Sequence, residues 1–453
     1  MLDLPSDTRW KKEDVSPLPA PEAILSAAMK VVMLIAGAGG MYCGSCLRDN
    51  RLAATLREQG RDVLLVPLYT PIRTDEQDIS EHKVQYGGVS VFLQQKSSLF
   101  RRTPAAIDRL LDSPALLRGV GRLAVKTKAG QLGPLTVSVL KGPEGRQAKE
   151  LRKLISMLES LEPDVVHLPN LMMVGLAESL KSSLGAAVVC SLSGEDIFLD
   201  ALIEPFRSQA FALIRKASDF VDGFAAPTRY YGGHAASHFD LPAERMHHVP
   251  MGIRVEDFSA PSGPPDGPLR IGYFARICPE KGLDRLADAF VRLRHDGHDC
   301  RLVVGGYLGA ADRPYFENIL RNIQTAGLSD HFEHWGEVGR AEKISLLQSL
   351  HVFSVPTVYH EAKGLYLLEA MAAGVPVVMP RQGSFPELVE LVDGGLLYHP
   401  ARPDSLSESL AQMLADRQRR SDHADQARKG AREHFNDRIM AEKTWRLYEQ
   451  LAR

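Results

Sequence analysis

Two glutamates in the second half of the chain have a spacing that suits sugar binding. Glu361 and Glu369 lie eight residues apart, and Gly364 between them can open a helix. This spacing predicts Glu361 in a loop and Glu369 two turns into the helix, both toward the same end of a sheet. Two such carboxylates can bind hydroxyls at two points of one sugar ligand. A solvated helix face is the ordinary alternative, but the apolar neighbours of Glu369 argue against it.

Two cations earlier in the same half suit a diphosphate. Arg276 and Lys281 lie five residues apart, where an expected strand turns through Pro279 into a helix. Cations near a helix N-terminus bind phosphate groups well. Taken alone, such a pair in a surface loop is more often simply solvated.

A glycine-rich segment near the N-terminus, residues 37–44, lies between an expected strand and a helix. Gly39 and Gly40 let the backbone approach a ligand closely, and we predict a loop that faces acceptor or phosphate groups. A dinucleotide fingerprint would need glycine at position 42, which is Tyr42. The next strand also lacks a terminal acid for a ribose, so a nicotinamide or flavin site is disfavoured. A plain tight turn is the alternative.

The same segment contains a C-x-x-C pair, Cys43 and Cys46. A helix start lowers a thiol pKa, as redox motifs require. A metal site would need a second pair of ligands, and none is suitably spaced. Without a thioredoxin-like context, two small residues in a crowded loop are the favoured interpretation.

Short apolar runs alternate with helix-length segments along most of the chain, which predicts parallel sheets covered by helices on both faces. In the first half the expected strands are Val31–Ala36, Asp62–Pro67, Gly88–Leu93, Asp164–Leu168, Ala186–Leu192, Gly223–Ala226 and Met246–Pro250. In the second half they are Leu269–Phe274, Leu302–Gly305, His331–Trp335, Val352–Val355, Val375–Met379 and Leu396–Tyr398. The fold class is therefore α/β, with two doubly wound domains.

A linker divides the two domains, because residues 259–268 contain four prolines and two glycines. We expect a loose tail at 1–28, an acceptor-binding domain at 29–258 and a nucleotide-sugar-binding domain at 269–436. A charged amphipathic helix at 437–453 is expected to pack back on the first domain. An ordinary terminal helix on the second domain alone is the alternative.

The composition is that of a globular protein: among 453 residues, 44% are hydrophobic and 24% are charged. Five cysteines are too few for a secreted disulfide framework. A net charge of -2 gives no general attraction to nucleic acid. No apolar run reaches eighteen residues, so no membrane span is expected. These features predict a cytoplasmic protein.

One region is strongly basic. Residues 101–153 contain twelve Lys or Arg and four acids. Such a patch suits an anionic acceptor or peripheral contact with the inner membrane face. A solvated basic face is an equal alternative.

The second half of the chain resembles the donor-binding half of GT-B glycosyltransferases, specifically the retaining enzymes of family 4. Arg276 and Lys281 match the family's diphosphate clamp. Glu361 and Glu369 match its E-x7-E signature, and residues 383–387 match its Gly-x-x-Pro-Glu segment. The three motifs occur in the family's order and are highly specific together.

The first half matches more weakly. Residues 163–167 and 249–253 resemble family segments, and the opening glycine loop resembles the start of bacterial glycogen and starch synthases. The resemblance implies a GT-B fold, two Rossmann-like domains with a cleft between them.

The resemblance also implies roles for the site residues. The two cations would neutralise the leaving nucleotide diphosphate, without a metal or other cofactor. Glu369 would hold the nucleotide ribose, Glu361 the hydroxyls of the donor sugar, and the amides of Gly364 and Leu365 a sugar or phosphate oxygen. His167, at the end of a matched segment, is a further candidate on the acceptor side, beside the glycine loop.

Two positions depart from the family pattern. Lys363 stands where a phenylalanine or similar residue is usual, and it can donate to phosphate or point to water. Ser193 stands where many members have a histidine near the sugar.

The sequence predicts a retaining hexosyltransferase that moves a sugar from a nucleotide-diphosphate sugar to a hydroxyl of a carbohydrate or lipid-linked acceptor. An α-glucan synthase-like enzyme is one alternative. A sugar-nucleotide 2-epimerase of the same fold is another, distinguished by release of nucleotide and epimerised sugar without an acceptor. A binding module without activity is a third, and the intact motifs count against it.

Overall fold

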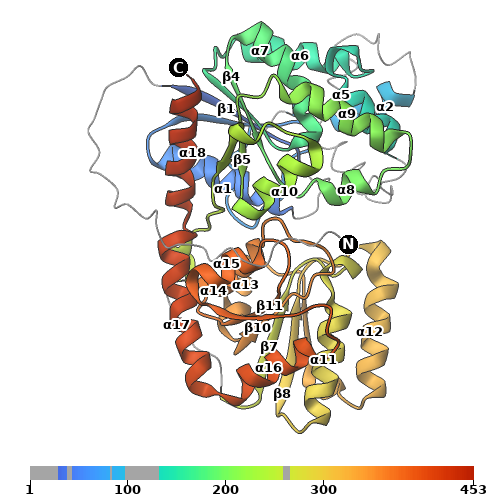
Figure 1. Cartoon of the computed structure of the whole chain (residues 1–453), viewed down its shortest axis with the longest axis vertical. Coiled ribbons are helices and arrows are strands. Elements are labelled where there is room, and N and C mark those ends of the chain that lie inside the picture. Colours follow the sequence, from blue (N-terminus) through green and yellow to red (C-terminus); the bar gives the residue numbers. More distant parts are fainter. Residues whose placement is uncertain (1–28, 38–42, 82–83, 97–131, 259–265, 453) are drawn as a thin grey trace.

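The computed structural model describes residues 29–37, 43–81, 84–96, 132–258 and 266–452. These residues form two α/β domains, which lie one above the other in Figure 1. Each domain contains a six-stranded sheet with helices around it. The doubly wound α/β fold expected from the alternation of apolar runs is confirmed.

The first sheet is parallel throughout and has the order β2-β1-β3-β4-β5-β6. Its central strands β3 and β4 are buried along their whole length, because helices cover both faces of a parallel sheet. The strands are β1 (Lys30–Ile35), β2 (Asp62–Pro67), β3 (Val165–Leu168), β4 (Ala187–Ser191), β5 (Gly223–Ala226) and β6 (Met246–His248). The helices are α1 (Gly44–Glu58), α2 (Gly88–Lys96), α5 (Gly133–Leu140), α6 (Ala148–Glu159), α7 (Ala177–Leu184), α8 (Asp196–Asp200), α9 (Phe206–Ser218) and α10 (Arg229–Phe239).

The second sheet is also parallel and has the order β12-β11-β10-β7-β8-β9. Its strands are β7 (Leu269–Phe274), β8 (Cys300–Gly305), β9 (Phe332–Gly336), β10 (Val352–Phe353), β11 (Val377–Pro380) and β12 (Gly395–Tyr398). The helices are α11 (Leu283–His295), α12 (Arg313–Thr325), α13 (Arg340–Gln348), α14 (Leu365–Ala372), α15 (Phe385–Val392), α16 (Ser405–Ala415) and α17 (Arg417–His434). Helices α13, α14 and α15 lie on the side of this domain that faces the first domain (Figure 1).

One expected strand is wrong. Residues Gly88–Leu93 belong to the helix α2. Their valines and phenylalanine favour a strand locally, but burial of one helical face outweighs this preference. Val91 and Gln94, three residues apart, are both buried. The Gln94 side chain donates to the Glu150 carboxylate of α6 at 2.7 Å.

The chain passes into the second domain soon after β6. Met251, Ile253, Val255 and Phe258 belong to the hydrophobic core of the second domain. The crossing therefore begins ahead of the proline-rich run at 259–268, of which residues 259–265 lie outside the described part.

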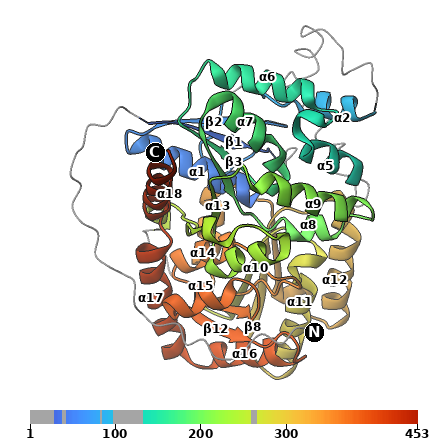
Figure 2. The ribbon, with the colours of Figure 1, turned by 45° about the horizontal axis from the view of Figure 1, so that its top comes forward.

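The last helix, α18 (Asp437–Leu451), lies on the first domain, although the helix before it belongs to the second. Met440, Trp445 and Tyr448 share a core cluster with β1 and α1. Figure 2 shows α18 beside α1, with α17 continuing it into the second domain. The chain therefore crosses between the domains twice.

Within the described residues, no helix combines the length and the apolar character that a membrane crossing requires.

Candidate active site

A cleft between the two domains holds the site residues predicted in the second domain. Its cavity has a volume of about 460 Å³ and is lined by loops that follow strands of both sheets. Ligands of parallel α/β sheets commonly bind at these carboxyl ends. The cavity lining includes every site residue predicted in the second domain, which are Arg276, Lys281, Glu361, Gly364, Leu365 and Glu369.

Lys281 and Glu361 form an ion pair in the wall of this cavity. Lys281 follows β7 and Glu361 follows the neighbouring strand β10, so the parallel sheet brings them together from distant parts of the sequence. The Lys281 Nζ lies 2.6 Å from Glu361 Oε2, and both residues are buried. Arg276, in contrast, is exposed at the cavity wall.

Two tyrosines complete the surroundings of this pair. The hydroxyls of Tyr359 and Tyr366 each donate to Glu361 Oε2 at 2.8 Å. Their ring centroids lie 5.0 and 4.7 Å from the Lys281 Nζ, within reach of a cation–π interaction. Burial would raise the pKa of Glu361, but Lys281 and the two hydroxyls outweigh it and lower the pKa to about 2. Glu361 is therefore a carboxylate at neutral pH, able to accept from sugar hydroxyls.

Helix α14 begins at the cavity. Gly364 precedes its first residue and has a φ of 70°, a left-handed conformation that favours glycine. The first amides of a helix have no acceptor within it, so the lining residues Gly364 and Leu365 suit a phosphate or sugar oxygen. Glu369 is the fifth residue of this helix, just over one turn inside rather than two.

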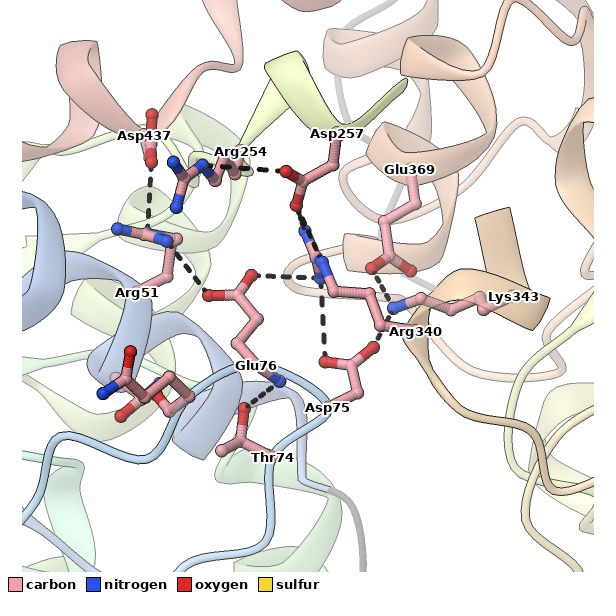
Figure 3. Close-up of polar contacts among 12 residues, drawn as sticks. Arg51, Thr74, Asp75, Glu76, Arg254, Asp257, Arg340, Lys343, Glu369 and Asp437 are labelled. Carbon is pink, nitrogen blue, oxygen red and sulfur yellow. Dashed lines mark hydrogen bonds and ion pairs between the residues drawn. The ribbon is translucent and has the colours of Figure 1, made fainter. Parts of the chain in front are cut away.

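The Glu369 carboxylate at the cavity is paired with a lysine of the neighbouring helix α13. Its Oε1 lies 2.5 Å from the Nζ of Lys343 on α13. The same Nζ lies 2.5 Å from Asp75 Oδ2, in the loop after β2 of the first domain (Figure 3). Burial alone would lower the pKa of Lys343, but Glu369 and Asp75 outweigh it and raise the pKa. The ammonium thus joins a predicted donor-binding carboxylate to the opposite domain.

Lys363, the departure within the E-x7-E segment, also reaches across the cleft. Its Nζ donates to the Ser45 hydroxyl at the start of α1, at 2.7 Å. Burial lowers the pKa of this ammonium. The alternative in which Lys363 points to water is wrong, because the side chain contacts the first domain.

The C-x-x-C pair lies at the same helix start. Cys43 lines the cavity, whereas Cys46 is buried in the first domain's core. A hydrogen bond from the Cys46 thiol and the nearby Lys363 ammonium lower the pKa of Cys43, although burial opposes them. The two thiols are free. Among the described residues, no cluster of His, Cys, Asp and Glu has the arrangement of a metal site.

The predicted acceptor-side residues do not all come together. His167 is buried under α18, where its ring nitrogens contact the Tyr448 hydroxyl at 2.5 Å and the Ser191 hydroxyl at 2.8 Å. Burial lowers its pKa to about 3. It does not line the cavity, whereas Ser193, at the other departure from the family pattern, does.

Two groups of predicted residues cannot be placed. Gly39 and Gly40, in the opening glycine loop, lie outside the described residues. So does most of the basic region at 101–153, because the described part resumes at Leu132.

Sequence reasoning missed four residues of this site. Tyr359 and Tyr366 flank Glu361 closely, and an aromatic residue on each side of a candidate sugar-binding carboxylate was the available signal. Asp75 and Lys343 gave none, because neither belongs to a recognisable motif and only the domain arrangement brings them together.

Comparison with known families agrees with this geometry. A model of glycosyl transferases group 1 matches residues 255–430, and a model of glycosyltransferase family 4 matches residues 50–257. Together the two matches span both domains. In both domains the chain is thus similar to family 4 glycosyltransferases, and its fold is of the GT-B type.

Proteins similar to this chain include mycobacterial mannosyltransferases. The GDP-mannose-dependent alpha-(1-6)-phosphatidylinositol monomannoside mannosyltransferase of Mycobacterium tuberculosis is 29% identical over 228 residues, 46% of this chain and 57% of that protein. The MMP alpha-(1->4)-mannosyltransferase of Mycolicibacterium hassiacum is 31% identical over 222 residues, 47% of this chain and 50% of that protein. The chain thus spans about half the length of these relatives.

Solved structures resemble most of the chain. HepE of Anabaena in complex with UDP has a TM-score of 0.65 at 16% identity, over 93% of this chain and 100% of that protein. Sucrose-phosphate synthase of Thermosynechococcus elongatus has a TM-score of 0.66 at 15% identity, over 93% of this chain and 99% of that protein. At such identities the likeness shows the fold, two Rossmann-like domains of GT-B type.

Proposed function

We propose that the protein is a retaining hexosyltransferase, which moves a sugar from a nucleotide-diphosphate-sugar donor to an acceptor hydroxyl. The observation that carries this proposal is the Lys281–Glu361 pair, with Arg276 and Glu369, around one cavity between two domains. The cations suit a diphosphate, and the carboxylates suit the hydroxyls of a sugar and a ribose. The similarity of both domains to glycosyltransferase families supports the same activity.

The residues of the clamp would act on the leaving group. As the bond between the sugar's anomeric carbon and the phosphate oxygen breaks, negative charge develops on the diphosphate. Arg276 and Lys281 neutralise that charge, and charge stabilisation of this kind is often the largest catalytic contribution. Glu361, held by two tyrosine hydroxyls, fixes the donor sugar so that the anomeric carbon faces the acceptor.

We propose retention without a covalent intermediate on the enzyme. Within the described part of the cleft, the carboxylates of Asp75, Glu361 and Glu369 are each paired with a lysine, an arrangement that suits binding better than nucleophilic attack. The acceptor oxygen attacks on the face that the diphosphate leaves. Its proton passes to an oxygen of the departing phosphate, so charge and protons balance without a further co-reactant.

The names of the relatives indicate which donor and acceptor classes to test first. We propose GDP-mannose as the first donor to test, since relatives are named as GDP-mannose-dependent mannosyltransferases. Both are named as phosphatidylinositol monomannoside mannosyltransferases, which supports a carbohydrate or lipid-linked acceptor. We also propose a cytoplasmic location with peripheral contact at the membrane surface, and activity without a metal ion.

The test is a donor and acceptor panel. The protein is incubated with GDP-mannose, UDP-glucose or ADP-glucose, with and without a phosphatidylinositol mannoside or an oligosaccharide. Acceptor-dependent release of nucleoside diphosphate, with an α-linked product by NMR, is expected. Release of nucleotide and an epimerised sugar without acceptor would show instead that the protein is a sugar-nucleotide 2-epimerase. No turnover of any donor, together with no nucleotide binding, would contradict it.

A further inference from the structure

The ion pairs around Lys343 form a bridge between the domains. Lys343 comes from α13 of the second domain, Asp75 from the loop after β2 of the first, and Glu369 from α14. All three line the cavity, yet their side chains are no more than 9% exposed. An ammonium buried between two carboxylates is strongly held, and losing either partner leaves the rest poorly compensated.

The bridge continues toward the place where the chain crosses between the domains. Arg340, one helical turn before Lys343, pairs with Glu76 at 3.1 Å and with Asp257 of the first crossing. Glu76 in turn pairs with Arg51 of α1 at 3.3 Å. Figure 3 shows these side chains as one connected set, with Asp75 between Arg340 and Lys343.

Arg51 extends the set to the second crossing. Its Nε lies 3.1 Å from Asp437, the first residue of α18. The ionic contacts therefore run without a break from Glu369 in the cavity to both crossings. A hinge motion that moved the first domain away would separate Asp75 and Glu76 from the second domain's cations.

We propose that Lys343 and Asp75 are positioning residues that make recognition of the nucleotide ribose by Glu369 depend on closure of the two domains. This inference rests on the proposed function, in which Glu369 binds the ribose. Lys343 holds one carboxylate oxygen of Glu369 and thereby sets the direction of the other. Asp75 holds Lys343 from the opposite domain, so this orientation is complete only when the cleft is closed.

The experiment measures preference for the ribose hydroxyls. Binding of UDP, GDP and ADP, each beside its 2′,3′-dideoxy counterpart, is measured by calorimetry on the full chain. For the nucleotide that binds best, we expect the wild-type protein to bind the ribose form with a Kd about tenfold lower than the dideoxy form. A hydrogen bond to a charged group changes Kd by about this factor. Lys343→Met should reduce this preference to about twofold or less, because Glu369 loses its orientation.

Asp75→Asn is a second variant, in which the side chain keeps nearly the same shape. It keeps Lys343 and Glu369 but removes the charge that reaches from the first domain. We expect the ribose preference to fall to between the wild-type and Lys343→Met values. X-ray scattering with saturating nucleotide should give a larger radius of gyration than for the wild type. Lys181→Met, which removes an ion pair with Asp222 outside the cleft, should keep the wild-type preference.

The outcomes separate this inference from the function it rests on. If the wild-type protein binds no nucleoside diphosphate, the proposed function fails. If it binds nucleotides but does not prefer ribose, or if both variants keep the wild-type preference, the positioning role of Lys343 and Asp75 is wrong. Equal scattering profiles for wild type and Asp75→Asn would contradict the dependence on closure.

Discussion

Ile253 and Asn436 pair as a single parallel β-bridge between the two crossings of the chain. The Ile253 N–H donates to the Phe435 carbonyl, and the Asp437 N–H donates to the Ile253 carbonyl, each at 2.9 Å. One crossing leads into the second domain and the other returns. Because the two are bonded side by side, any opening of the cleft must bend both together.

Gly252 permits this close approach, which leads to the first prediction. A Cβ at this position would lie 2.4 Å from the Asn436 carbonyl oxygen and 2.7 Å from the Asp437 Cα. Backbone must therefore shift in Gly252→Ala, and we expect the free energy of unfolding to fall by about 1–3 kcal/mol. Urea unfolding measures this. Gly233→Ala, where a Cβ meets nothing within 4 Å, is the control and should be neutral or slightly stabilising.

The second prediction concerns the two cations of the clamp. Arg276→Ala and Lys281→Met should each raise the transition-state free energy by about 2–4 kcal/mol, measured as kcat/KM with the best donor. Their effects on stability should differ. Lys281→Met leaves Glu361 buried without its cation, so Tm should fall, whereas exposed Arg276 can be replaced with little change. Wild-type kcat/KM in either variant would contradict the clamp.

The third prediction is a pH dependence of stability through Glu361. Its pKa is about 2 in the folded protein, against about 4.3 in an unfolded chain. The unfolded state therefore binds the proton first as pH falls. The stabilisation by ionised Glu361, on the order of 3 kcal/mol, is present above about pH 5 and is lost as pH falls toward 2.

Urea unfolding between pH 7 and pH 3 tests this dependence. The gap in unfolding free energy between the wild-type protein and Glu361→Gln should narrow as the pH falls. The exposed pair of Arg402 and Glu408 supplies the control, because Glu408→Gln should differ little from wild type at any pH. A constant gap for Glu361→Gln would show that the ion pair with Lys281 does not stabilise the carboxylate.

The sequence predicted which residues of the second domain line this cavity, for a physical reason. Strand ends of a parallel sheet meet at one edge, so motifs after β7 and β10 had to converge once the alternation was recognised. Their residue types then predicted a diphosphate and a sugar as ligands, which stays a prediction. The α/β class followed from the same alternation. This class was predicted correctly although one expected strand, Gly88–Leu93, belongs to a helix.

The remainder of the site depends on tertiary contacts that no local pattern encodes. Lys343 lies on a helix whose sequence reads as ordinary surface, and Asp75 lies in a loop without a motif. His167 shows the opposite error, because a matched segment pointed to the cleft while the apolar stripe of α18 covers the residue. Ion pairs between the domains depend on how the two domains are placed relative to each other, and sequence spacing does not predict this placement.

The fourth prediction is that turnover does not require a divalent metal. In the proposed mechanism, Arg276 and Lys281 supply the positive charge that a metal would otherwise place on the diphosphate. Rates in EDTA should therefore equal rates in Mg²⁺ or Mn²⁺ at the same ionic strength. Activity that EDTA abolishes and Mg²⁺ or Mn²⁺ restores would show that the clamp needs a metal.

The fifth prediction concerns α18, which supports the first sheet although it follows the second domain in sequence. Trp445 is buried in the core cluster that contains β1 and α1, and its ring lies 4.6 Å from the Arg61 guanidinium. Trp445→Ala should therefore cost about 3–5 kcal/mol through the cavity it leaves. Hydrogen exchange should quicken in β1, β4 and β5 and stay unchanged in β11 and β12.

Arg438→Ala on the same helix is the matched control for this prediction. Arg438 is exposed, and its ion pair with exposed Glu256 is long, at 3.7 Å, so the substitution should leave exchange in both sheets unchanged. Deletion of residues 437–453 should have the larger effect, exposing an apolar face of the first domain while the second domain keeps its core. If Trp445→Ala instead quickened exchange in β11 and β12 alone, α18 would stabilise the second domain. The prediction that α18 stabilises the first sheet would then be wrong.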